Sequence, residues 1–145
     1  VVVAMVYFDA SLESTSRLYV ERRRALDVLE AALTSKGGRR AMGSDTLYIF
    51  DACVSRALDA VLASRKALEG VKAGFGVARG PIFEGEVVGG APVGVAARLC
   101  AQHGVHLSKP AAEALDPDHG LRTVPVFLQG SDSSGVLEEF CQVLC

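Results

Sequence analysis

Two charged side chains, Asp9 and Arg98, occupy positions from which they could do chemistry. Asp9 follows an apolar run and is expected at the end of a strand. There its carboxylate could bind a divalent cation or cap the following helix, since Asp suits both roles, and both readings stay open. Arg98 lies near the middle of a short predicted helix, and taken alone it would be a surface arginine in a salt bridge. The elements around the two residues must decide between these roles.

The most informative of these elements lie between Gly74 and Ser108. This stretch predicts a strand, a glycine-rich hairpin, a short helix that carries Ala96-Ala97-Arg98-Leu99, and a second strand. The glycines of the hairpin are explained by tight turns and close backbone approach alone.

Composition narrows the class of protein. A chain of 145 residues predicts a single domain over residues 1–145, and its Val-Val-Val start without Met predicts a fragment of a longer protein. No apolar run approaches the ~20 residues needed to span a bilayer. The net charge of −2, without a basic stripe, argues against a nucleic-acid partner.

Cysteine and histidine usage gives no sign of a metal site or a disulfide framework. The four cysteines form no CxxC pair, and the three histidines lack metal-ligand spacing. Cys53 and Cys100 are expected to be buried free thiols on helices, which suits a reducing, cytoplasmic location. The histidines are expected at the surface or at loop ends.

The order of predicted elements is β-α-β-β-α-β followed by an αβ(α)ββ extension, an α+β arrangement with a ferredoxin-like core. The expected elements are a strand at 1–8, a helix at 14–34 ended by Gly37-Gly38, a tight hairpin of 40–42 and 46–50 around Gly43-Ser44, a helix at 51–69, a strand at 71–78, the glycine-rich hairpin, the Arg98 helix, a strand at 105–108, a short helix at 111–115, and a hairpin of 121–128 and 136–144.

The ordered glycines and the helix motif resemble the catalytic domains of class III nucleotidyl cyclases, which make cyclic AMP or cyclic GMP. The resemblance rests on Gly76-x-x-x-Gly80, Gly85, the run from Gly90 to Leu99, and the strand at 105–108. These residues come in the order that the family has, after the predicted β-α-β-β-α-β elements. It covers the chain from Tyr7 to about Leu115.

The resemblance implies two divalent ions held by two aspartates. Asp9, two residues after Tyr7, matches the first of them, although the family's following glycine turn is replaced by a run that includes Glu13. The second position falls on Ser44. Asp45 would serve only if the register shifted by one residue, because such a shift turns a side chain to the other face of a strand.

The remaining family positions are also changed. The resemblance assigns purine recognition to Arg40, where adenylyl cyclases usually have lysine, and to Val87, which cannot hydrogen-bond a base. The ribose-binding asparagine is replaced by Gly94. Arg98 matches the arginine that offsets charge in the transition state.

Two functions are therefore expected, with a preference for the first. The first is a degenerate cyclase-homology domain that acts as a dimerising, regulatory or ligand-binding module of a larger protein and needs no cofactor. The second is a divergent active cyclase that uses Mg or Mn, alone or as one half of a heterodimer. The expected partners are a second copy or another cyclase-like domain, with a nucleotide as a possible ligand. A diguanylate cyclase is disfavoured, because the hairpin lacks that family's Gly-Gly-acidic-acidic tip.

Overall fold

The computed structural model of the chain describes residues 1–8, 16–51, 53–68, 71–117, 119–129 and 137–144, without the side chains of residues 16–19 and 129. Its elements are β1 (Val2–Phe8), α1 (Ser16–Ser35), β2 (Gly38–Arg40), β3 (Leu47–Phe50), α2 (Val54–Ala67), β4 (Ala73–Arg79), β5 (Phe83–Glu84), β6 (Val88–Gly89), α3 (Ala91–Cys100), β7 (Gly104–Leu107), α4 (Lys109–Glu113), β8 (Arg122–Gln129) and β9 (Leu137–Leu144). This order confirms the predicted β-α-β-β-α-β core and its extension.

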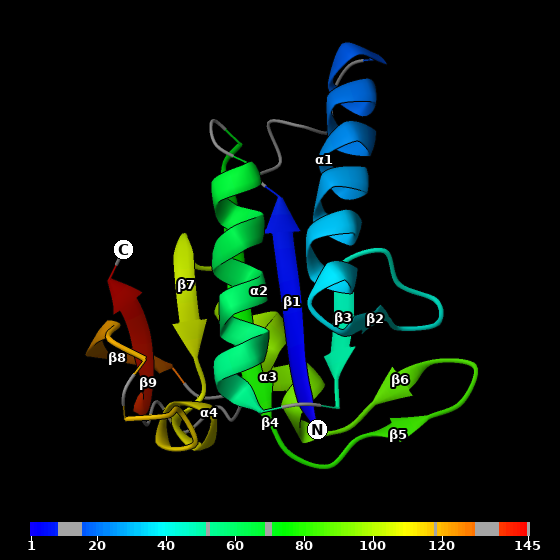
Figure 1. Ribbon diagram of the computed structural model, residues 1–145. Coiled ribbons are helices and arrows are strands. Elements are labelled where there is room, and N and C mark those ends of the chain that lie inside the picture. Colours follow the sequence, from blue (N-terminus) through cyan, green and yellow to red (C-terminus); the bar gives the residue numbers. More distant parts are fainter. Residues whose placement is uncertain (9–15, 52, 69–70, 118, 130–136, 145) are drawn as a thin grey trace.

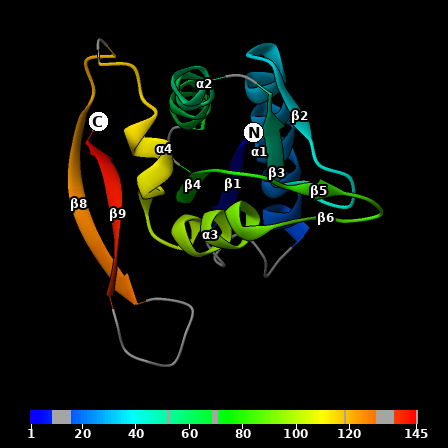
Figure 2. The same ribbon diagram turned by 90° about the horizontal axis from the view of Figure 1, so that it is seen from below.

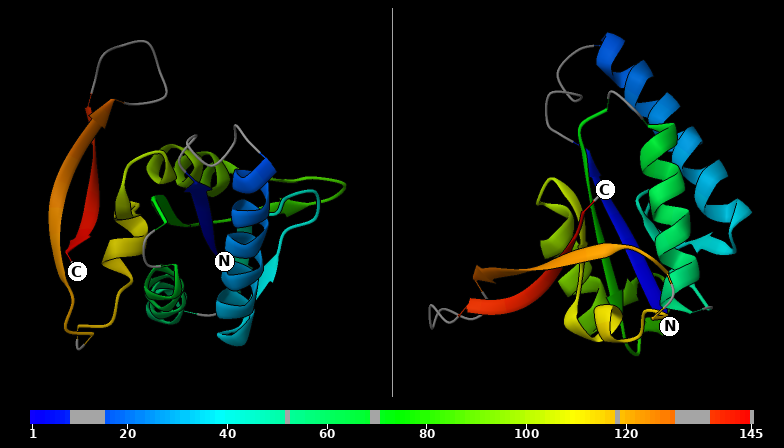
Figure 3. Two further views of the ribbon diagram at one scale, coloured as in Figure 1. Left: turned by 90° about the horizontal axis from the view of Figure 1, so that it is seen from above. Right: turned by 60° about the vertical axis from the view of Figure 1, so that its left-hand side comes forward.

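The sheet has the strand order β2-β3-β1-β4-β7-β9-β8, and β5 and β6 form a separate hairpin. The strands β4 and β7 pair in parallel, whereas the other paired strands are antiparallel. The helices α1 and α2 cover one face of the sheet and α3 lies on the other (Figures 1 and 2). The β5–β6 hairpin extends from the body beside the β2–β3 connection, while β8–β9 lies at the opposite edge and runs past α3 (Figure 3).

The two faces bury two apolar clusters. The larger lies under α1 and α2 and includes Leu29, Leu33, Leu58, Phe75 and Leu107. The smaller lies on the side of α3 and is formed by Val3, Ala41, Leu47, Ile49, Ala78 and Ala96. Because successive side chains of a strand point to opposite faces, both faces of the central strands are apolar, which explains the nearly continuous apolar run of β1.

Two glycines let α3 lie directly on β4. A Cβ atom added to Gly74 would lie 2.1 Å from the carbonyl oxygen of Cys100, and one added to Gly76 would lie 2.3 Å from that of Ala96. Contacts this short with helix backbone exclude any side chain at either position. These two strand glycines, for which the sequence predicted no such role, therefore set the close approach of α3 to the sheet.

The predicted tight hairpin around Gly43-Ser44 is wider than expected. The predicted strand at 40–42 is shifted to Gly38–Arg40, and β3 begins only at Leu47. The shift has a packing reason, because a Cβ on Gly38 would lie 2.6 Å from the Phe50 ring, so glycine lets β2 start early against β3. The preceding helix, α1, ends at Ser35, two residues before Gly37, which has a φ of 93°.

Two expectations of burial are wrong. Cys53 is exposed, because it is the N-cap residue of α2 rather than part of its buried face. His106, expected at the surface, is only 4% exposed in the centre of β7. Cys100 is buried, as predicted, and burial raises the pKa of its thiol to about 11.

None of the described helices is both long and apolar enough to cross a membrane.

The contact between α3 and β4 predicts opposite effects for two glycine substitutions. Gly76→Ala should lower the free energy of unfolding by about 2–4 kcal/mol, because the helix backbone must move away. Gly94→Ala should raise it by about 0.5–1 kcal/mol, because nothing lies within 4 Å of an added Cβ and alanine favours helix. Urea denaturation of both variants measures this. Equal midpoints for the two would contradict the described packing.

Candidate functional site

The turn between β2 and β3 holds Ser44 in a structural role. Its Oγ accepts hydrogen bonds from the backbone N–H groups of Thr46 at 3.2 Å and Leu47 at 3.1 Å. The Ser44 N–H itself donates to the carbonyl oxygen of Ala41 at 3.2 Å. The hydroxyl at the proposed metal position is therefore already engaged by the turn that carries it.

Four of the sequence-predicted residues gather at this turn. Arg40, Ser44 and Asp45 line an open hollow of about 670 Å³ together with the residues between them. Val87, on the β5–β6 connection, lies beside it, because a Cβ on Gly43 would be 3.8 Å from Val87 Cγ1. Arg40 and Asp45 are exposed, so solvent reaches both charges.

The end of β1 lies next to the same turn. The Val6 N–H donates to the carbonyl oxygen of Thr46 at 3.1 Å, and β1 pairs with β3 from Val2 to Met5. Asp9, the expected first metal ligand, lies outside the described residues. The described part of β1 ends at Phe8, so the role of Asp9 stays a prediction.

Gly94 and Arg98 lie on α3, and the contacts of Arg98 are with β9 rather than with the hollow. Gly94 is exposed and faces open space. The Arg98 Nη2 donates to Glu138 Oε2 at 3.4 Å, and the guanidinium lies 5.6 Å from the centroid of the Phe140 ring. Both contacts are on β9, and β1, β4 and β7 lie between β3 and β9 in the sheet. Within one chain, Arg98 is thus directed away from the hollow.

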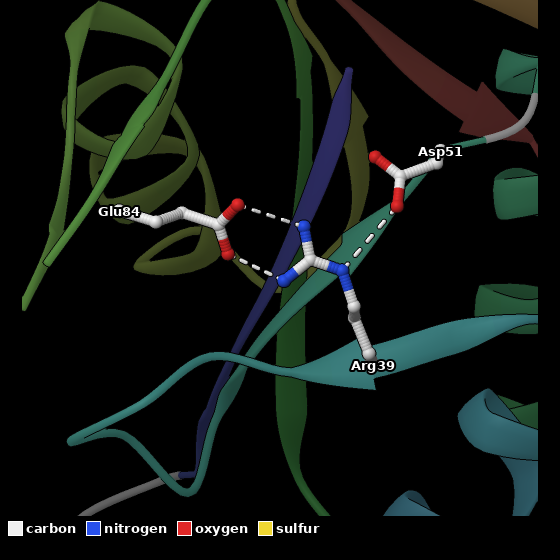
Figure 4. A network of polar contacts seen from close by, with 3 residues as sticks. All are labelled: Arg39, Asp51 and Glu84. Carbon is white, nitrogen blue, oxygen red and sulfur yellow. Dashed lines mark hydrogen bonds and ion pairs between the residues drawn. The ribbon is translucent and has the colours of Figure 1, made fainter.

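An ion-pair network links the β5–β6 hairpin to β2 beside the hollow (Figure 4). Arg39 binds Glu84 through both terminal nitrogens, with Nη2 to Oε2 at 3.0 Å, and its Nε donates to Asp51 at 3.3 Å. The hydrogen bond from Arg39 lowers the pKa of the Glu84 carboxyl. This network was not predicted, because nothing in the local sequence indicates that Arg39 pairs with a residue 45 positions away.

The described donors do not fit a pair of hard divalent cations. Such ions prefer carboxylate oxygens, whereas the described part of the site offers the engaged hydroxyl of Ser44 and the exposed carboxylate of Asp45. No cluster of three or more His, Cys, Asp or Glu side chains suited to a metal occurs in the part of the chain that the structure describes.

Two buried nitrogen atoms lack hydrogen-bond partners within the described ranges: Nη1 of Arg98 and Nδ1 of His106. His106 pairs across β7 with Gly76 on β4 and Gln142 on β9, which places it on the face that α3 covers. Burial lowers the pKa of its imidazole. No pattern in the sequence indicates this burial, because a single histidine within a short strand is ambiguous.

Solved structures resemble this chain along nearly its whole length. An adenylate/guanylate cyclase/hydrolase from Silicibacter pomeroyi superposes with a TM-score of 0.77 at 17% identity, covering 99% of this chain and 95% of its own. The catalytic core of a rhodopsin-guanylyl cyclase of converted specificity, in complex with ATPαS, gives 0.79 at 13% identity and covers 99% and 94%. The adenylyl cyclase CyaB from P. aeruginosa gives 0.74 at 11% identity and covers 99% and 92%.

The chain has the fold of a class III nucleotidyl cyclase catalytic domain. No protein-family model and no curated protein matches its sequence. The cyclase fold is thus retained at identities that leave the chemistry of each site residue to be argued from this chain itself.

The two hydrogen bonds that Ser44 Oγ accepts in the β2–β3 turn predict how substitutions of Ser44 change stability. Ser44→Ala removes the acceptor of two backbone N–H groups and should lower the free energy of unfolding by about 1 kcal/mol. Ser44→Asp supplies an equivalent acceptor and should leave stability close to that of the parent chain. Thermal denaturation measures both. An unchanged Ser44→Ala variant would show that the turn does not depend on this hydroxyl.

Buried His106 predicts a loss of stability in mild acid. The unfolded imidazole takes up a proton near its ordinary pKa of about 6.5, whereas the buried one resists protonation, since its folded pKa is lowered. Proton uptake by the unfolded state therefore lowers the free energy of unfolding as pH falls below about 6.5. Urea titrations between about pH 7.5 and 5 should show a shallower decline for His106→Leu. Parallel curves would refute this assignment.

Proposed function

We propose that this chain is a non-catalytic cyclase-homology domain that acts as a dimerising or regulatory module of a larger protein, possessing the scaffold of a cyclase without its chemistry. The observation that carries the proposal is Ser44, whose hydroxyl serves its own turn where the family has a metal-binding carboxylate. The other changed positions support it, because Gly94 and Val87 offer no hydrogen-bonding side chain.

The magnitude of these losses favours inactivity. Removing one transition-state donor costs roughly a hundred- to thousandfold in rate. Here Ser44 replaces a metal ligand, Gly94 replaces the ribose-binding asparagine, and Val87 replaces a residue that hydrogen-bonds the purine. The effects of such losses on the rate combine even though they do not simply add.

The exposed surface supports association with a second cyclase-like domain. Met42, Phe83 and Val87 are 69%, 67% and 68% exposed, and they lie on the adjacent β2–β3 and β5–β6 hairpins. The Arg39 network links the second hairpin to β2. In class III cyclases the subunits pair head-to-tail, and the site forms between them. That arrangement accounts for Arg98 lying away from Ser44 within one chain.

The alternative is a divergent active cyclase or one half of an asymmetric pair, which converts ATP or GTP into a cyclic nucleotide and pyrophosphate. The surviving Arg98 is the observation that favours it. In that case Mg or Mn would be required, as in related cyclases, with Asp9 as a ligand. Cytoplasmic location is expected under either function.

A cyclase assay separates the two functions. Purified chain incubated with ATP or GTP and Mn²⁺ should form no cyclic nucleotide above the background set by Arg98→Ala, because the metal donors are depleted. Product that disappears in Arg98→Ala would establish the alternative instead.

The same preparations test the module role by sedimentation velocity. We expect a concentration-dependent dimer that is weakened when Phe83 and Val87 are both replaced by Ser. The matched control replaces Val20, which is similarly exposed on α1, by Ser. A strict monomer at high concentration, with no binding to its natural partner domain, would contradict the proposal.

A further inference from the structure

The two buried nitrogen atoms without partners among the described residues, Nη1 of Arg98 and Nδ1 of His106, have complementary chemistry. A guanidinium nitrogen is always a hydrogen-bond donor, whereas a neutral imidazole has one nitrogen that accepts. A polar atom left unpaired in the interior is costly, so a folded chain that buries two of them needs a physical explanation. The two atoms explain each other if they lie close enough to pair.

The strand order brings the two side chains to the same part of the sheet. α3 lies directly over Gly76 of β4, and β7 lies between β4 and β9. Arg98 starts on α3 and contacts Glu138 and Phe140 on β9, so its side chain spans β7. His106 is the β7 residue that pairs with Gly76, and it is therefore on the face that Arg98 crosses.

The two residues also lie at the same level along the strands. A Cβ atom added to Gly76 would lie 2.3 Å from the carbonyl oxygen of Ala96 and 2.9 Å from the Cβ of Leu99. The turn of α3 that carries Arg98 is therefore the turn that lies over Gly76. Because Gly76 and His106 are partners in the parallel register, Arg98 begins its crossing of β7 beside His106.

The other polar atoms of both side chains are consistent with a hydrogen bond between them. Nη2 of Arg98 already donates to Glu138 at 3.4 Å, which leaves Nη1 as the buried, unpaired end of the guanidinium. Nε2 of His106 is not a buried unpaired atom, so it can carry the hydrogen of the neutral ring while Nδ1 accepts. A rotation of either side chain that brings Nη1 to Nδ1 satisfies both atoms at once.

Few other ionisable groups of the described chain face His106. α3 contributes Arg98 and the thiol of Cys100, which is neutral because burial raises its pKa to about 11. β9 contributes the uncharged Gln142 opposite His106, together with Glu138, which is paired with Arg98. β4 contributes a glycine. A proton on His106 would therefore place a second positive charge beside Arg98.

We propose that His106 is the positioning residue of Arg98 and makes its placement depend on pH. In the neutral ring, Nδ1 accepts a hydrogen bond from Arg98 Nη1, which holds the guanidinium against β9. When His106 takes up a proton from solvent, Nδ1 becomes a donor and the ring a cation, so the ring repels the guanidinium instead of binding it. Arg98 is then released from β9 toward solvent.

This switch goes beyond the cyclase-homology function, because it concerns contacts within one chain. It operates whether or not the chain catalyses a reaction or forms a dimer. A negative cyclase assay or a strict monomer would therefore leave it untouched, and it needs a test of its own.

Hydrogen exchange of the Arg98 Nε–Hε group tests the hydrogen bond, by NMR of the ¹⁵N-labelled chain at about pH 7, where the ring is neutral. The signal is assigned by its loss in Arg98→Lys. His106→Leu removes the acceptor, and exchange should become about three- to tenfold faster, as the loss of one net hydrogen bond implies. His106→Asn places an uncharged acceptor near the position of Nδ1 and should restore slow exchange. His103→Asn changes an exposed histidine on the α3–β7 connection and is the matched control, which should have no effect.

A titration from about pH 7.5 to 4.5 tests the switch itself. The Arg98 Nε shift should change in one step at the pKa of His106, which burial lowers from its ordinary value of about 6.5. The step should be absent in His106→Asn and present in Glu138→Gln, which removes the carboxylate of the ion pair.

Three results would overturn the proposal, each in variants whose backbone spectra show them folded. The first is unchanged Arg98 exchange in His106→Leu. The second is exchange in His106→Asn as fast as in His106→Leu. The third is a His106 ring that gains its proton without any shift at Arg98.

Discussion

The rest of the described structure depends on the direct contact of α3 with β4. Gly74 and Gly76 bring the helix backbone so close that an added Cβ would lie within 2.1–2.3 Å of carbonyl oxygens of Cys100 and Ala96. This contact buries Ala96 and closes the smaller apolar cluster. It also sets the height of α3 above the sheet, and therefore the position of Arg98. A displaced helix would disturb the cluster and Arg98 together.

Hydrogen-bonding groups of two predicted site residues, Ser44 and Arg98, are used within the chain, but they are not held equally firmly. Ser44 bonds to N–H groups two and three residues away, so its partners stay close whatever binds nearby. Arg98 pairs with Glu138 across half-exposed surface, at side-chain exposures of 30% and 45%, and such pairs contribute only about 0.2–1 kcal/mol. A competing anion could therefore recruit Arg98, whereas Ser44 would have to disrupt its turn. Of the two predicted site residues, Ser44 is thus the more firmly held in a structural role.

The sequence predicted the element order from apolar periodicity and turn residues, and it predicted the cyclase-like fold from the resemblance of its ordered glycines and helix motif to that family. It failed where distant residues decide the outcome. The early start of β2 depends on Gly38 fitting under Phe50, and the burial of His106 depends on α3 lying over β7. The Arg39–Glu84 pair and the Arg98–Glu138 pair join segments about 40 residues apart. Charge alone does not specify such partners. The roles of Asp9, Arg40 and Arg98 remain predictions.

The positions that differ from the cyclase pattern are those at which folding imposes little constraint. Gly94 faces open space, Val87 is 68% exposed, and Arg40 is exposed on a short edge strand. Gly94 even weakens its helix relative to alanine, and nothing in the structure explains it. Gly74 and Gly76, in contrast, cannot change without moving α3. A chain that is no longer required to catalyse a reaction would therefore keep Gly74, Gly76 and its apolar clusters, which folding requires. Its exposed site residues could change without affecting the fold. Retention of the fold is consequently no evidence for retention of the reaction.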